Sequence, residues 1–180
     1  MNPILLIDRA LKKIGRVWRK AVFRRSINCP HKDFSLVGNV TLINRNLKLG
    51  RGVCIYPGCM FFGNGPIVIG DNVDIGNDTV IYSSEDAGVS IGENTLIAAQ
   101  CYIIDTDHGM RADEPIRSQQ NTSKPVSIGS DCWLAANVTV LKGSEIGDGA
   151  VIGAKSLVKG TVEPYSINVG IPCRKIGRRS

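Results

Sequence analysis

One histidine of this sequence stands where it could carry out acid–base chemistry. His108 lies in the polar run Asp105-Thr106-Asp107-His108-Gly109. Imidazole has an unperturbed pKa of about 6.5, so it can take up and release a proton at neutral pH. A neighbouring carboxylate would hold the ring and favour its protonated form. Asp105 and Asp107 are both candidates for that role, and either could instead cap a turn of a loop.

The other histidine, His31, follows Cys29 and Pro30 well before this run. We expect it to be structural, because an isolated histidine usually is. The six cysteines form no C-x-x-C pair, which favours reduced, mostly buried thiols over disulfides. At His108 we expect one bound molecule to attack another directly, and not to react through a covalent intermediate on a protein side chain.

A repeat of six residues predicts the elements that must position His108. Isoleucine, leucine or valine recurs at every sixth position in three runs: Ile69, Ile75, Ile81; Ile91, Ile97, Ile103; and Ile128, Leu134, Val140, Ile146, Ile152, Val158. Glycine or a turn former often follows, and the fifth position of each repeat is small or β-branched. This period fits neither a helix nor plain alternation. Short strands joined by corners would stack as coils, so the sequence predicts an all-β, parallel β-helix.

The repeat is broken once in a major way, between Ile103 and Ile128. We expect residues 105–124 to leave the coil as a long polar loop with His108 at its root. Long loops on a rigid solenoid are a common place for function.

From about residue 36 to residue 176 the chain resembles the hexapeptide-repeat acyltransferases. The resemblance is carried by residues 125–129, 132–138, 143, 146–154 and 170–174. It implies a left-handed β-helix with three repeats per coil, a homotrimer with sites shared between subunits, and His108 as the catalytic base. The chain is similar to the branch that contains galactoside, maltose and Nod-factor O-acetyltransferases and the capsule or O-antigen acetyltransferases.

The resemblance also implies acetyl-CoA as the donor, with no metal. The donor would lie along the outside of the helix between subunits, against Trp133, Ala135, Ala136, Ala154, Lys159 and Arg174. Backbone groups at Ala136 and Ala154 would meet the pantetheine, and Arg174 the adenosine phosphates. Small side chains allow such an approach, although corner geometry alone could require them.

Two departures from the family pattern concern this donor site. The chain has Trp133-Leu134-Ala135 where the family commonly has Trp-Ile-Gly, and the lysine at Lys159 is displaced by one position.

The net charge of +6 is concentrated at the N-terminus. Residues 1–28 hold eight basic residues and one acidic residue, so they carry +7, and residues 29–180 carry −1. We expect residues 1–28 to form a separate basic helix, because Ile4, Ile7, Leu11, Ile14, Trp18 and Ala21 recur at helical spacing. Its apolar face would pack on the body or a sister subunit, or lie on an anionic membrane surface. The localised charge argues against nucleic-acid binding.

The sequence therefore predicts two parts: a basic amphipathic helix over 1–28 and an acyltransferase β-helix over 29–180. The function we expect is acetyl transfer from acetyl-CoA to a sugar or glycan hydroxyl in surface polysaccharide biosynthesis. The expected location is the cytoplasm, with the inner membrane face as a peripheral site. The alternatives are N-acetylation of an amino sugar nucleotide or antibiotic, and a non-catalytic scaffold. A γ-class carbonic anhydrase is disfavoured, because it needs three histidine ligands for zinc and the chain has two histidines.

Overall fold

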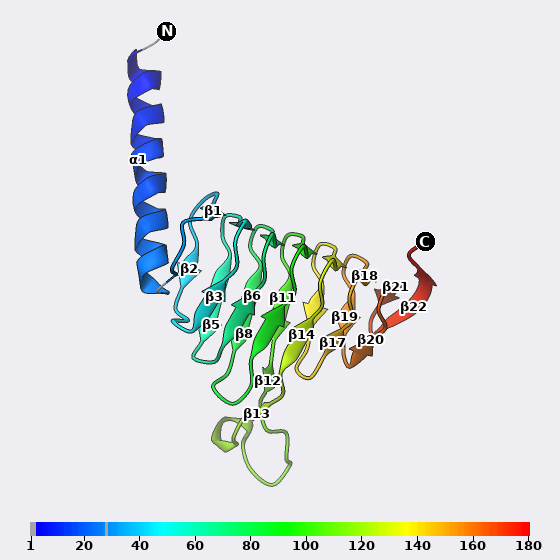
Figure 1. Cartoon of the computed structure of the whole chain (residues 1–180). Helices are drawn as coiled ribbons and strands as arrows, with labels where there is room; N and C mark the ends of the chain where they lie inside the picture. The colour runs from blue at the N-terminus through cyan, green and yellow to red at the C-terminus, as the bar shows by residue number, and fades with distance from the viewer. Residues whose placement is uncertain (1–2, 28) are drawn as a thin grey trace.

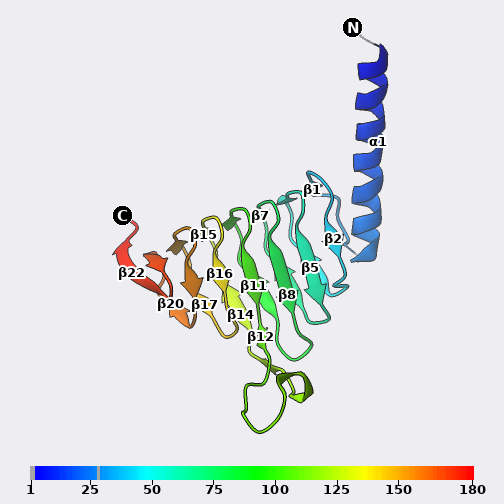
Figure 2. The same ribbon diagram turned by 180° about the vertical axis from the view of Figure 1, so that it is seen from behind.

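The computed structural model describes residues 3–27 and 29–180, with the backbone alone for residues 3–12. It consists of one helix, α1 (Pro3–Ser26), and a solenoid of stacked three-sided coils (Figures 1 and 2). The expected parallel β-helix is confirmed. Of the predicted helical segment 1–28, residues 1–2 and 28 lie outside the described residues, as do the side chains of Ile4, Ile7 and Leu11.

Three sheets run along the solenoid, and their strands pair in parallel except at the C-terminal end. The first sheet contains β1 (Phe34–Leu36), β4 (Val53–Ile55), β7 (Asp74–Ile75), β10 (Leu96–Ile97), β15 (Trp133–Leu134), β18 (Val151–Ile152), β21 (Ser166–Gly170) and the antiparallel β22 (Cys173–Arg178). The second contains β2 (Thr41–Leu42), β5 (Met60–Gly63), β8 (Val80–Ser83), β11 (Tyr102–Ile104), β16 (Thr139–Val140) and β19 (Leu157–Val158). The third contains β3 (Leu47–Leu49), β6 (Ile67–Ile69), β9 (Val89–Ile91), β14 (Val126–Ile128), β17 (Glu145–Ile146) and β20 (Thr161–Val162).

The six-residue repeat supplies the core of this solenoid. All twelve aliphatic residues of the three runs are at most 3% exposed. They stack in register from coil to coil, as Ile75, Ile97, Leu134 and Ile152 do in the first sheet. Each fully buried aliphatic side chain contributes roughly 1.5–3 kcal/mol, so the stacked interior stabilises the coils without any long strand.

The corners use the left-handed backbone conformation that the turn formers of the repeat allow. Asn72, Asn94 and Asp131 have φ of 55°, 58° and 53° and follow one another at the corner between the third and first sheets. Asparagine and aspartate tolerate this conformation better than most residues. The regular corners keep the coils in register at the two edges that border the first sheet.

The edge between the second and third sheets is irregular. The step between buried aliphatic residues across it is six residues from Val140 to Ile146, ten from Ile81 to Ile91 and 25 from Ile103 to Ile128. The last step contains the predicted loop, which hangs away from the solenoid (Figure 1). Two short antiparallel strands, β12 (Thr106–Asp107) and β13 (Thr122–Ser123), close its base, and a 3₁₀ turn, η1 (Ile116–Ser118), lies within it.

The helix α1 contacts the solenoid through its C-terminal end. The Phe23 ring lies 6.0 Å from that of Phe34 in the first coil, and Lys20 Nζ lies 4.9 Å from the centre of the Phe34 ring. The helix runs across the end of the solenoid and its N-terminal half extends beyond it (Figures 1 and 2). Over the described residues, no helix combines the length and the apolar character needed to cross a bilayer.

Candidate active site

His108 is exposed and follows β12 directly, at the root of the loop. No hydrogen bond to another described residue engages its ring. The backbone at this point is held by the β12–β13 pairing, in which Asp107 is opposite Thr122. The histidine therefore combines a fixed backbone with a ring that is open to an incoming group.

Asp105 belongs to the coil and not to the loop. Its residue is fully buried, which corrects the expected start of the loop at residue 105. Its carboxylate accepts hydrogen bonds from the Ser83 hydroxyl at 3.1 Å and from the Ser84 N–H at 2.9 Å. Both donors lie on the preceding coil, so the carboxylate ties two coils together where the loop departs.

Of the two candidate aspartates, Asp107 is the one that lies in the loop. Its Oδ2 is 3.2 Å from Lys142 Nζ, and both side chains are partly exposed. The same ammonium group donates to the Thr122 hydroxyl and, at 3.2 Å, to the Thr122 carbonyl. Lys142 thus fixes both strands of the loop base to the next coil, one residue away from His108.

Gln119 organises the rest of the loop, a role that no pattern in the sequence predicted. Its side-chain amide donates to the carbonyls of Arg111 at 2.8 Å and Glu114 at 2.9 Å, and its oxygen accepts from the Arg111 N–H at 2.8 Å. A Cβ added at Gly109 would come within 2.6 Å of the Gln119 Cβ. The residue after His108 must therefore be small for the loop to close in this way.

Three of the residues expected at the donor site lie together on the edge between the first and second sheets. Ala135 and Ala136 follow β15, and Ala154 follows β18 in the next coil. The Lys155 N–H donates to the Ala136 carbonyl at 2.9 Å, which places the two corners side by side. Ala98 and Ala99 continue the series one coil earlier. We call this row, Ala98–Ala99, Ala135–Ala136 and Gly153–Ala154, the alanine edge.

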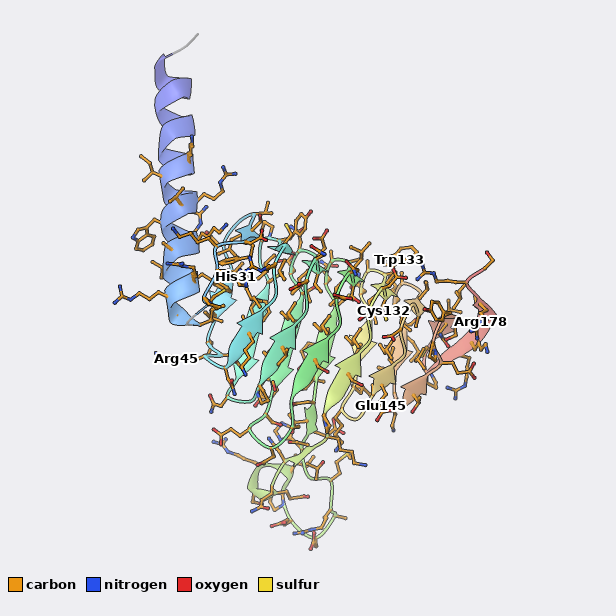
Figure 3. The ribbon with its side chains drawn as sticks, viewed as in Figure 1. His31, Arg45, Cys132, Trp133, Glu145 and Arg178 are labelled. Carbon is orange, nitrogen blue, oxygen red and sulfur yellow. The ribbon has the colours of Figure 1, made fainter. Side chains whose placement is uncertain are left out.

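Trp133 lies next to the alanine edge on the outer surface of the first sheet, where it is labelled in Figure 3. Its side chain is 51% exposed, and Leu96 and Val151 flank it in register on the neighbouring coils. The tryptophan therefore presents an open apolar surface beside a row of small corner residues.

Lys159 and Arg174 lie at the C-terminal end of the solenoid. Arg174 is opposite Val169 of β21, and the Gly153 N–H of the alanine edge donates to the carbonyl of Asn168 on the same strand at 2.8 Å. Lys159 and Arg174 line one pocket of about 190 Å³ together with Lys175. Lys175 donates to Glu163 at 2.6 Å and holds the pKa of that exposed carboxyl below its usual value. The pocket is basic and could hold a phosphate group.

His108 and the alanine edge lie on opposite sides of the second sheet. The loop leaves the coil after β11, whereas Ala98 and Ala99 precede β11. The chain runs six residues from Ala99 to Asp105, three of them in β11, so at about 3.3 Å per residue the two edges are separated by at most roughly 20 Å. Within one chain, His108, which is expected to act on the acceptor, and the alanine edge, which is expected to bind the donor, do not lie in one cleft.

The spacing of two serine motifs found in hydrolases occurs in this sequence, but neither serine has the structural context that the motif requires. Gly88-Val89-Ser90-Ile91-Gly92 fits Gly-x-Ser-x-Gly, but its serine lies in the flat strand β9 and no helix follows. Ser156 and Lys159 fit Ser-x-x-Lys, but Ser156 is buried and accepts a hydrogen bond from the Gly170 N–H at 3.0 Å. Neither serine is placed as a nucleophile.

No group of three or more histidine, cysteine, aspartate or glutamate side chains that could hold a metal ion occurs in the part of the chain that the structure describes.

Two family models match the repeats. "Bacterial transferase hexapeptide (six repeats)" covers residues 125–160, and "Hexapeptide repeat of succinyl-transferase" covers residues 66–104. WbbJ of Escherichia coli (strain K12), whose name assigns it to lipopolysaccharide biosynthesis as an O-acetyl transferase, is 39% identical over 123 residues, which are 64% of this chain and 62% of WbbJ. Galactoside O-acetyltransferase of the same organism is 32% identical over 143 residues, 79% of this chain and 63% of that protein. The chain thus spans a little under two thirds of the length of either relative.

Among solved structures, AntD, an N-acyltransferase from Bacillus cereus in complex with dTDP and 3-hydroxybutyryl-CoA, superposes with a TM-score of 0.78. The match covers 90% of this chain and 88% of AntD at 20% identity, so this likeness concerns the fold. The repeats in both matched segments, the solenoid that they build and the similarity to these relatives confirm the resemblance predicted from the sequence: the chain is similar to the hexapeptide-repeat acyltransferases.

Proposed function

We propose that this protein transfers an acetyl group from acetyl-CoA to a hydroxyl of a sugar in surface polysaccharide biosynthesis. The observation that carries the proposal is the position of His108, an exposed imidazole on a fixed backbone at the root of the only long loop in the described solenoid. The O-acetyl transfer named for WbbJ and for galactoside O-acetyltransferase supports the choice of reaction.

In the proposed mechanism, His108 takes the proton of the acceptor hydroxyl as the oxygen attacks the thioester carbonyl. The C–S bond then breaks, the acetyl group stays on the acceptor oxygen, and the thiolate of coenzyme A receives the proton from the imidazolium. A backbone N–H at a coil corner would stabilise the oxyanion. Lys142 and Gln119 serve this step indirectly, because they hold the loop that carries the histidine.

The site is proposed to form between subunits of a homotrimer. The alanine edge and the His108 loop flank opposite sides of the second sheet, so a donor lying on one chain's alanine edge can meet the histidine of a neighbouring chain. Trp133 would then pack against the acetyl group. The basic pocket at Lys159 and Arg174 would bind phosphates of the donor.

Transfer to an amine is the second candidate, because AntD shares the fold and is an N-acyltransferase. Transfer to an amine differs from transfer to a hydroxyl in one respect that can be tested. A neutral amine is already a nucleophile, whereas a hydroxyl must lose its proton during attack, so an O-transfer reaction depends more strongly on the base at His108.

The deciding experiment is a screen of nucleotide sugars and lipid-linked glycans with release of free coenzyme A as the readout. We expect release with hydroxyl acceptors and a loss of at least about 10²-fold in kcat for His108→Ala. The matched control is His31→Gln, because His31 is far from the loop and bonds the Leu49 carbonyl at 3.0 Å (Figure 3). Full activity of His108→Ala would remove the histidine from the mechanism, and release with amine acceptors alone would exclude O-transfer.

A further inference from the structure

The helix α1 carries an apolar face that the solenoid does not cover. Ile14, Val17, Trp18 and Val22 are 65%, 63%, 67% and 44% exposed. Spacings of three and four residues place them on one side of the helix. A face with a tryptophan and three large aliphatic residues is costly to leave in water.

The contact with the body uses a different side of the helix. Phe23 and Ile27 are buried at the helix end, and Phe23 packs near Phe34. With 3.6 residues per turn, Phe23 lies about 140° around the helix from Trp18. Trp18 and Val22 line a groove of about 310 Å³ together with Leu36 and Val40 of the solenoid, so the coils border this face without covering it. The N-terminal half of α1 extends beyond the end of the solenoid (Figures 1 and 2).

The residues around this face are positively charged. Between residues 9 and 28 the sequence has eight basic residues and no acidic one. By the same helical geometry, Lys13 lies about 40° from Val17 and Arg19 about 60° from Val22, so both flank the apolar face. Arg16 and Lys20 lie about 160° from Trp18, on the opposite side of the helix. Long basic side chains beside an apolar face can reach the phosphates of a bilayer while the apolar residues enter the interface.

We propose that α1 docks this protein on a bilayer that contains anionic lipids, with Ile14, Val17, Trp18 and Val22 in the interface. The positive charge of the helix complements the negative charge of the lipid headgroups. The helix lies at one end of the solenoid and the β21–β22 hairpin at the other, so a docked helix leaves the His108 loop and the alanine edge open.

A second copy of the same helix is a poorer partner for this face. Pairs of exposed amphipathic helices gain specificity from opposite charges on their flanks. Here both flanks are basic and residues 9–28 offer no carboxylate to a neighbour. Packing two copies of α1 together would bring like charges close to one another. An anionic lipid surface would instead neutralise the basic residues.

The test is flotation of the full chain with vesicles of phosphatidylcholine alone or mixed with phosphatidylglycerol. We expect binding to the anionic vesicles, at least about tenfold weaker binding to the neutral ones, and a decline in binding as salt is raised. Trp18→Asp should lower binding to anionic vesicles by at least about tenfold. The matched control is Ile176→Asp, since Ile176 is 66% exposed on β22 at the far end of the molecule among basic residues.

The possible results distinguish docking on a bilayer from pairing with a second copy of the chain. Equal flotation of wild type and Trp18→Asp, or equal flotation on both kinds of vesicle, would overturn the proposal. A change in oligomeric mass of Trp18→Asp by light scattering, with vesicle binding unaltered, would assign the face to a second copy. The docking does not depend on the transfer reaction, so failure of either proposal leaves the other standing.

Discussion

Asp105 and Asp107 lie two residues apart at the root of the loop, and their carboxylates have different neighbours. Asp105 is buried and accepts hydrogen bonds from Ser83 and Ser84 of the preceding coil. Asp107 is partly exposed and pairs with Lys142 of the following coil. Because Asp105 has both oxygens engaged in the coil, Asp107 remains the candidate for holding the His108 ring.

Replacing Asp105 with alanine should therefore lower the stability of the fold. The change leaves the Ser84 N–H without its buried acceptor, so we expect the free energy of unfolding to fall by about 1–3 kcal/mol. Urea unfolding followed by circular dichroism measures this. Asp107→Ala is the matched control, and loss of its exposed ion pair should cost less than about 1 kcal/mol. An equal loss of stability in both variants would contradict the assignment.

The buried thiols should make stability depend on pH in the alkaline range. Cys59 is fully buried, and burial raises the pKa of its thiol to about 11. The folded state thus holds the thiol proton more tightly than the unfolded chain, whose thiols titrate at about 8.5. This contribution to stability is complete below that pH and is lost as the pH rises towards 11.

The measurement is the free energy of unfolding of wild type and Cys59→Ala between pH 7 and about 11. Ala150 occupies the equivalent buried position of another repeat, so we expect the fold to accept alanine in place of Cys59. We expect the difference between the two proteins to change only above the unfolded thiol pKa. A constant difference over the whole range would show that Cys59 ionises as freely in the fold as in the unfolded chain.

At the scale of the elements, the regular part of the solenoid could be predicted from the sequence and its irregular edge could not. The period of six fixes which residues are buried, because each turn of the coil repeats the same strand and corner. The ten-residue step from Ile81 to Ile91 separates two runs of the repeat, but its position on this edge was not predicted, since its polar residues resemble any turn. The place where the loop begins also escaped prediction, because Asp105 is anchored by serines more than 20 residues earlier in the chain.

The corners provide a test of how tightly the coils stack. A Cβ added at Gly92 would lie 2.5 Å from the Ser130 nitrogen and 2.6 Å from the Gly129 carbonyl carbon. Backbone of the next coil cannot move aside easily, so Gly92→Ala should lower the free energy of unfolding by about 1–3 kcal/mol.

The matched control for Gly92 is Gly177→Ala. Its added Cβ would meet only the Ile167 side chain, at 3.8 Å, which is an ordinary contact. Thermal unfolding of both variants should separate them, with a lower Tm for Gly92→Ala alone. A similar Tm for the two would mean that the coils are packed more loosely at this corner than the distances indicate.

At the scale of the whole molecule, the repeat places the same kind of corner on every coil, so a site for a long ligand is built along an edge. The alanine edge spans three coils in this way, from Ala98 to Ala154. The loop that carries His108 occurs once, on the other side of the second sheet. In the proposed mechanism a site that uses both features takes them from two chains, an arrangement that neither the period nor the composition predicts.

Mixing two inactive variants tests this arrangement directly. His108→Ala removes the base, and Ala154→Trp fills the alanine edge at an exposed corner without entering the core. If each site takes its histidine from one subunit and its alanine edge from another, trimers assembled at random from equal amounts of both variants should regain about one quarter of the wild-type kcat, since each site is intact only when both contributing chains are suitable. Co-expression with two affinity tags and coenzyme A release provide the measurement. Each variant purified alone is the control and should remain inactive. Mixed trimers that stay inactive would place the complete site within one chain.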